Sequence, residues 1–153
     1  FGNARVFGNA RVFGNARVSG NAQVSGNAQV FGDARVFGNA RVYSDAQVSG
    51  DAQVFGDARV FGNAWVYSDA WVFGGKWLLN PSHVLLPRHS ITICKPGHLQ
   101  IGCYCLTFDE WIRRFSEIGK SNNYTDNEIK IYGQAITMLV NGVRDGLISD
   151  GSE

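Results

Sequence analysis

Hydrophobic and polar residues recur along the first half of this chain with a period of six. From Phe1 to Val72 the sequence consists of twelve consecutive hexapeptides of the form x-Gly/Ser-Asn/Asp-Ala-x-Val, in which the fourth position is always Ala and the sixth is always Val. Six is a multiple of the two-residue period of a β-strand and not of the helical period, so Ala and Val point to one side of an extended segment and the residue between them to the other. Gly favours corners, and Asn and Asp tolerate them. The pattern predicts short strands with Ala and Val inside and a turn every six residues.

Such a chain is expected to close into a coil whose successive turns pair as parallel strands. The repeat resembles that of the hexapeptide-repeat proteins, in which a small residue follows four places after an aliphatic one, as Ala10 follows Val6 here. The resemblance implies a mainly β fold, a left-handed parallel β-helix of about four coils with three hexapeptides per coil, over residues 1–78. The chain departs from the family directly after the aliphatic residue, where it carries Phe, Tyr or Ser in place of a small or acidic residue. This departure separates it from the ordinary enzymes of the family.

The repeat is expected to end at its thirteenth unit. Aligning residues 73–78 with the repeat places Lys76 at the inner Ala position and Leu78 at the inner Val position, and leaves Trp77 outside. An unpaired charge in a narrow apolar interior is very costly. We therefore expect the coil to stop at Lys76.

Residues 79–153 have a different composition and are predicted to form a small α+β cap over the last coil. Thr107 with Glu110, and Thr125 with Glu128, match capping boxes that precede helices reaching to about Gly119 and Asn141. The tail from residue 145 is expected to be frayed. The predicted strands are 84–86, 90–94 and 99–106, of which the last two form a hairpin.

The cap is similar to the C-terminal region of uncharacterised hexapeptide-repeat proteins from bacteria and their phages. The similarity is carried by stretches such as Arg88–Thr92, Cys94–Gly97 and Asp109–Trp111. It implies a bacterial or phage origin and indicates no particular activity.

Composition narrows the classes of function. The chain has 153 residues, a net charge of +1 and 18% charged residues, which is typical neither of a strongly basic nucleic-acid binder nor of an acidic disordered tail. No apolar run approaches the roughly 18 residues of a membrane span, and Arg recurs where a signal peptide would be apolar. Three cysteines cannot all pair within the chain, which favours a reducing compartment. We expect a cytoplasmic protein without membrane contact.

Folding the repeat onto eighteen-residue coils places aromatic residues and Arg on all three outer sides. A large exposed aromatic surface usually marks contact with another molecule, although stacking between successive coils explains the same pattern. We expect a non-enzymatic scaffold or binding protein that self-associates, with a trimer favoured, or that binds another protein. The candidate binding residues are Phe37, Arg41, Phe55, Arg59, Tyr43, Trp65, Tyr67, Trp71 and Trp77.

Two other functions remain open. Acyl transfer, known from resembling enzymes, would require a His as general base, and the candidates are His83, His89 and His98, all outside the repeats. Nucleotide or nucleic-acid binding would use base stacking on the Phe and Arg columns.

Cofactors are not predicted. A zinc site would draw on Cys and His side chains, but their spacing differs from paired Cys-x-x-Cys knuckles, so no metal is expected. The candidates that were weighed for it are Cys94, His98, Cys103 and Cys105.

Overall fold

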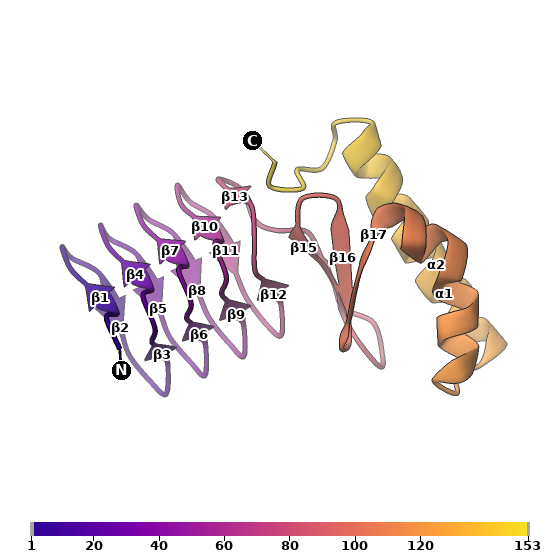
Figure 1. The fold of residues 1–153 in the computed structure, drawn as a ribbon, viewed down its shortest axis with the longest axis horizontal. Coiled ribbons are helices and arrows are strands. Elements are labelled where there is room, and N and C mark those ends of the chain that lie inside the picture. Colours follow the sequence, from indigo (N-terminus) through magenta and orange to yellow (C-terminus); the bar gives the residue numbers. More distant parts are fainter. Residues whose placement is uncertain (1, 153) are drawn as a thin grey trace.

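The protein forms a β-solenoid that leads into a small α+β cap, as the computed structural model of the chain shows (Figure 1). The structure describes residues 2–152. Each hexapeptide contributes one two-residue strand, and the capping sheet and both helices follow at one end of the stack (Figure 1). The solenoid strands are β1 (Arg5–Val6), β2 (Arg11–Val12), β3 (Arg17–Val18), β4 (Gln23–Val24), β5 (Gln29–Val30), β6 (Arg35–Val36), β7 (Arg41–Val42), β8 (Gln47–Val48), β9 (Gln53–Val54), β10 (Arg59–Val60), β11 (Trp65–Val66), β12 (Trp71–Val72) and β13 (Lys76–Trp77).

Three parallel sheets form the sides of the solenoid. Their strand orders are β1-β4-β7-β10-β13, β2-β5-β8-β11 and β3-β6-β9-β12. Arg5 pairs with Gln23 and Val6 with Val24, so the register advances by one eighteen-residue coil. The predicted solenoid of about four coils is confirmed.

The interior consists of Val and Ala, as the period of six predicts. Every Ala and Val from Ala22 to Val72 is no more than 2% exposed. Burying a valine stabilises a fold by about 1.5 to 3 kcal/mol, so these repeated side chains form the main apolar core of the solenoid. Val6 in the first coil is 47% exposed.

The corners are held by backbone conformation and by side-chain ladders. Most corners place Gly at a positive φ, and Ser44 and Ser68 take its place at φ 61° and 60°. Corner side chains also donate from coil to coil, as Asn21 Nδ2 does to Asn39 Oδ1 at 3.3 Å and Asn39 Nδ2 to Asp57 Oδ1 at 3.1 Å. These hydrogen bonds favour a fixed vertical register.

The thirteenth unit differs from its prediction. Arg59 pairs with Lys76 and Val60 with Trp77, which is one residue short of the usual spacing. Trp77 is therefore inside and 1% exposed, whereas Lys76 is exposed and Leu78 is 57% exposed. The predicted inward positions of Lys76 and Leu78 and the predicted outward position of Trp77 are wrong. One corner residue is missing here, and its loss moves each following side chain to the opposite side.

The cap contains an antiparallel sheet and two helices. The helices are α1 (Phe108–Ser121) and α2 (Asp126–Arg144), and both begin with the predicted capping boxes. The predicted strand over 99–106 is wrong, because a turn at Gly102 divides it in two. The sheet order is β14 (His83–Val84), β15 (Ile91–Lys95), β16 (His98–Ile101) and β17 (Tyr104–Thr107).

The cap closes each side of the last coil differently. On the side of β12, the amide of Phe73 donates to Cys94 O in β15 at 3.0 Å. On the side of β11, the amide of Trp65 donates to Asn80 Oδ1 at 2.7 Å. These contacts satisfy backbone donors that would otherwise pair with a further coil.

The C-terminal tail closes the third side. Lys76 N donates to Gly151 O at 2.7 Å, and Gly151 is buried against the ring of Trp77. Asp150 Oδ2 accepts from Gly97 N at 3.0 Å. The tail is therefore docked, and the prediction that it is frayed is wrong for the residues described.

Candidate functional site

Aromatic side chains at the first position of the repeat stack at the corners. The eighteen-residue register places them above one another at the interstrand spacing of about 4.8 Å. Ring centroids are 4.8 Å apart for Phe37 and Phe55, with an interplanar angle of 1°, and 5.2 Å apart for Phe55 and Phe73. Shorter stacks join Phe13 to Phe31 and Tyr43 to Phe61, both at 5.1 Å. Stacking between coils is therefore confirmed.

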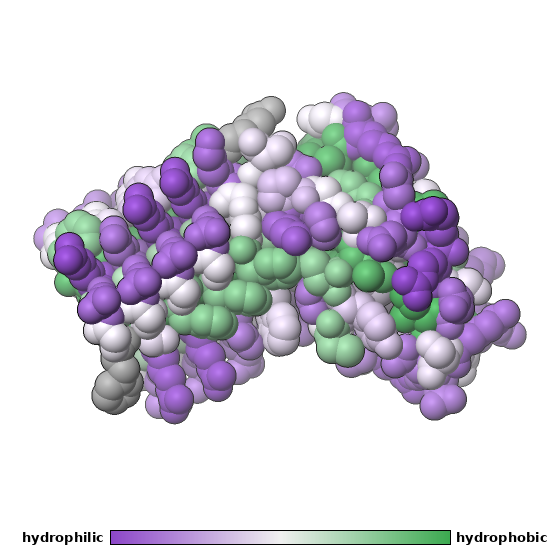
Figure 2. All heavy atoms as spheres, viewed as in Figure 1, coloured by the Kyte–Doolittle hydropathy of each residue, from purple (hydrophilic) through white to green (hydrophobic). Residues whose placement is uncertain are grey.

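The longest stack joins the solenoid to the cap. We call Phe37, Phe55 and Phe73 the aromatic column. The indole of Trp71 meets Phe55 edge-on at 6.3 Å, and Lys95 Nζ of the cap lies 5.2 Å from the Phe73 ring centroid. Figure 2 shows a hydrophobic band along the solenoid, flanked by rows of hydrophilic side chains and continuing toward the cap. Within residues 2–152, this column of three rings is the longest aromatic stack at the corners of the solenoid.

The other predicted binding residues lie on different sides of the molecule. Arg41 and Arg59 are exposed neighbours in β7 and β10. Trp65 is 44% exposed and donates from Nε1 to Ser49 Oγ at 2.7 Å, next to Tyr67, which is 37% exposed. Tyr43 belongs to a separate stack, and Trp77 is in the interior. The nine predicted residues therefore do not form one site.

The stacking geometry bears on the nucleic-acid hypothesis. Phe37 and Phe55 lie parallel at 4.8 Å, and Phe55 and Phe73 stack at 5.2 Å with an interplanar angle of 23°, so neighbouring rings cover much of each other's faces. A base stacks on a free ring face. In the aromatic column such a face is left only at an end, so the geometry favours contacts along the ring edges.

A cleft with several polar side chains lies between the last coil and the capping sheet. We call it the junction cleft; its volume is about 390 Å³. Thr92 and Gln100 are 2% and 6% exposed and form its floor. The cleft is lined by Asp69, Trp71, His89, Ser90, Thr92, Gln100, Gly102 and Cys103.

A chain of polar contacts links this cleft to a buried histidine. His83 Nδ1 lies 2.7 Å from Thr92 Oγ1, and His83 Nε2 lies 3.1 Å from Asp69 Oδ1, although the ring N–H is not aimed at that oxygen. Ser90 Oγ donates to Asp69 Oδ2 at 2.8 Å. Burial lowers the pKa of His83, and this outweighs the opposite effect of the Asp69 carboxylate. His83 is therefore neutral at pH 7 and ties the cap to the solenoid.

The three candidate catalytic histidines have separate surroundings. The His83 side chain is 2% exposed. His89 is exposed, and its ring lies against Tyr124 at 6.4 Å. His98 Nδ1 is 2.8 Å from Pro96 O. The structure does not gather them into one site for acyl transfer.

Of the four candidate zinc ligands, the structure brings only Cys94 and Cys105 together. Cys94 Sγ and Cys105 Sγ are 3.7 Å apart, and burial raises the pKa of the Cys94 thiol. Cys103 is exposed in the turn before β17, and the ring of His98 contacts Pro96. Within residues 2–152, no group of three or more His, Cys, Asp or Glu side chains has a geometry that could hold a metal.

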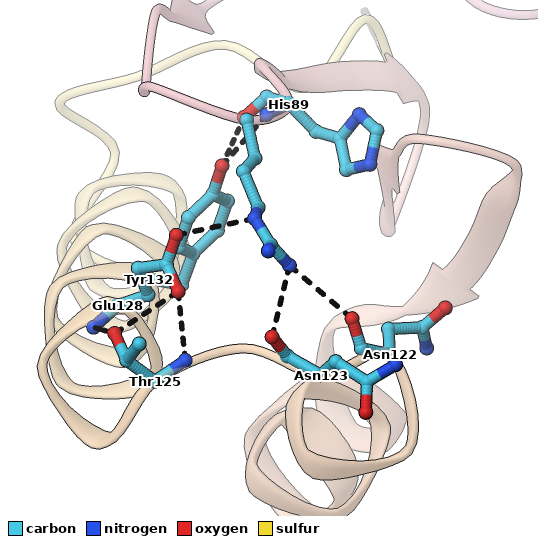
Figure 3. A network of polar contacts seen from close by, with 7 residues as sticks. His89, Asn122, Asn123, Thr125, Glu128 and Tyr132 are labelled. Atoms are coloured by element: carbon cyan, nitrogen blue, oxygen red, sulfur yellow. Dashed lines mark hydrogen bonds and ion pairs between the residues drawn. The ribbon is translucent and has the colours of Figure 1, made fainter.

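A second polar network fixes the loop that leads into the junction cleft (Figure 3). Tyr132 Oη donates to His89 O and accepts from His89 N, both at 2.8 Å. Arg88 Nε pairs with Glu128 Oε1 at 3.2 Å, and its Nη1 donates to carbonyls at the end of α1. The sequence did not indicate this network, because it joins residues more than thirty positions apart.

The repeats match one known family model. The YdcK beta solenoid repeat matches residues 10–26, 22–36, 28–50 and 52–68. The chain is a β-solenoid repeat protein. Searches of curated proteins and of solved structures gave no match to this β-solenoid protein. Neither helix among the described residues has the length and apolarity needed to cross a membrane.

Proposed function

We propose that this β-solenoid protein is a non-enzymatic scaffold that self-associates side by side through its aromatic column. A β-solenoid repeat suits a structural or binding role, because its sides are long and regular. The observation that carries the proposal is the surface stack of Phe37, Phe55 and Phe73, at spacings of 4.8 and 5.2 Å.

The spacing of the column favours a second copy of this chain as the partner. A surface that presents one ring per coil is best matched by a surface with the same rise per coil. Another solenoid of the same sequence has that rise along its whole length. Its rings would fall between or beside those of the first copy in the coils that carry Phe37, Phe55 and Phe73, and a closed assembly such as a trimer follows where the rotation closes.

Light scattering on size-separated protein tests this proposal. In the variant carrying Phe37→Ser and Phe55→Ser, the aromatic column is removed while the fold is kept, because Ser19, Ser25 and Ser49 occupy the same repeat position. The control carries Tyr43→Ser and Phe61→Ser at another corner. We expect the wild type and the control to be oligomers of equal mass, and the column variant to be a folded monomer.

Two results would overturn the proposal. A monomeric wild type at every concentration would reject self-association. Equal masses for all three proteins, with unchanged circular dichroism, would show that association uses a different surface.

A further inference from the structure

We propose that the junction cleft is a binding site for an organic cation rich in N–H donors, a guanidinium or alkylammonium group. This inference is independent of self-association. It rests on the hydrogen-bonding state of four polar side chains that line the cleft, Asp69, Ser90, Thr92 and Gln100, and on the indole of Trp71 beside them.

Two of the donors in the cleft are used within the protein. The hydroxyl of Ser90 donates to Asp69 Oδ2 at 2.8 Å. The amide Nε2 of Gln100 donates one of its two N–H groups to Gly102 O. Both side chains keep oxygen lone pairs, and the Gln100 carbonyl has no hydrogen bond to another described residue.

The donor of Thr92 is used as well. The Asp69 carboxylate lies 3.1 Å from His83 Nε2, and although that N–H is not aimed at the oxygen, the negative charge favours the neutral tautomer that carries its proton on Nε2. His83 Nδ1 is then an acceptor, and the hydroxyl of Thr92 donates to it at 2.7 Å. In this tautomer Thr92 also presents only lone pairs to the cleft.

The polar atoms left for a ligand are therefore mainly acceptors, beside the second N–H of the Gln100 amide. The acceptors comprise the carboxylate of Asp69, the hydroxyl oxygens of Ser90 and Thr92, and the amide oxygen of Gln100. Gln100 is 6% exposed and Thr92 2% exposed, so these acceptors are fixed in place and shielded from most solvent. A ligand with several N–H groups would pair with these acceptors, and its hydrogen bonds to the Asp69 carboxylate would be charge-assisted.

Charge points to the same class of ligand. The contact from His83 to Asp69 is made by a neutral ring, so it does not neutralise the carboxylate, and the Asp69 side chain is 55% exposed. Asp51 occupies the same corner in the coil below, whose repeat carries no cation, and adds negative potential, whereas Asp33 one coil further down has Arg35 beside it. Trp71 supplies an indole ring, the side chain with the strongest cation–π attraction.

The size of the site sets an upper limit on the ligand. A volume of about 390 Å³ is within the range of small-molecule pockets and accommodates one guanidinium group with a short alkyl chain. The same chemistry occurs in free alkylguanidines and in arginine side chains of a peptide, and the test separates these sources.

Calorimetric titration with n-butylguanidinium tests the proposal, and n-butylurea is its neutral control of the same shape. We expect the cation to bind and the urea not to bind. Asp69→Asn should lower the affinity about tenfold or more, because a charge-assisted contact is lost. Trp71→Gln should lower it about two- to fivefold, and it keeps the fold, because Gln53 holds the equivalent position one coil below.

The matched control is Trp65→Gln, a change at the same repeat position on another side of the solenoid, which should leave the affinity unchanged. Binding of an acetyl-Gly-Arg-Gly amide in place of the free guanidinium would support the cation site and assign its source to a peptide. The proposal is overturned if neither probe binds, if butylurea binds equally well, or if Asp69→Asn and Trp71→Gln both leave the affinity unchanged.

Discussion

Trp77 lies directly above Val60, in the inward position that valine holds in the coils below. It reaches that position because the last corner is one residue shorter. The large indole fills the end of the narrow interior, and Gly151 of the tail lies on its ring. The solenoid is closed at this end by a side chain from the repeat region and a backbone segment from the end of the chain.

The inward assignment of the repeat is tested by substitutions at two adjacent residues. Val36 is 0% exposed and Arg35 is exposed. Val36→Asp places an unpaired charge in the interior and should lower the free energy of unfolding by about 3 to 5 kcal/mol or more. Arg35→Gln, an exchange that the repeat already contains, should change it by less than about 0.5 kcal/mol. Denaturation followed by circular dichroism measures both, and a stable Val36→Asp protein would refute the assignment.

Docking of the tail is tested at two glycines. Gly151 has φ +80°, and a Cβ there would lie 2.7 Å from Trp77, whereas Gly146 has φ +70° and open space around it. Both changes to Ala carry the cost of left-handed backbone. Gly151→Ala should lower the free energy of unfolding by about 1 to 3 kcal/mol more than Gly146→Ala, because it also displaces the tail. Equal effects in urea denaturation would mean that the tail does not pack on Trp77.

The strain at a serine corner gives a stabilising prediction. Ser44 has φ 61°, which Gly adopts without steric cost. Ser44→Gly should raise the free energy of unfolding by up to about 1 kcal/mol, the left-handed strain being partly offset by the greater freedom of the unfolded chain. Ser19→Gly is the control, because Ser19 lacks a positive φ and should gain nothing. Thermal melts that rank the two variants the other way would contradict this explanation.

Stability should depend on pH through His83. Its pKa in the folded protein is below the ordinary value of 6.5, so as pH falls through 6.5 the unfolded chain binds more protons than the folded one. The free energy of unfolding therefore decreases with acidification, from near pH 6.5 until the folded pKa has been passed. Urea midpoints between about pH 8 and about pH 5 should fall more steeply for the wild type than for His83→Gln. Parallel pH profiles would show that His83 does not titrate in this way.

The sequence predicts local features of this protein better than contacts between distant segments. The inward Val and Ala, the glycine corners and the capping boxes at Thr107 and Thr125 are all confirmed, because each depends on residues within one turn or one repeat. The position of Trp77 was predicted wrongly, since the loss of one corner residue looks like a substitution in an alignment with the repeat. Gly151 docks onto β13 through a hydrogen bond from Lys76, 75 positions away in the sequence, and no local sequence pattern predicts such a contact.

The candidate sites divide in the same way. The stacking of Phe37, Phe55 and Phe73 follows from the period of the repeat. The junction cleft does not follow from that period. In the sequence Asp69 is one of several corner residues, and only the folded cap places Thr92 and Gln100 beside it. The role of the aromatic residues in binding stays a prediction.

Side-by-side self-association is tested most directly by sedimentation velocity of the wild-type protein across a salt series. The proposed association uses apolar contact through the aromatic column, so the proposal predicts a closed oligomer of one mass from about 0.05 M to about 1 M salt, over which screening of exposed charges changes severalfold. A monomer at every concentration, or species that lengthen as salt is lowered, would contradict the account.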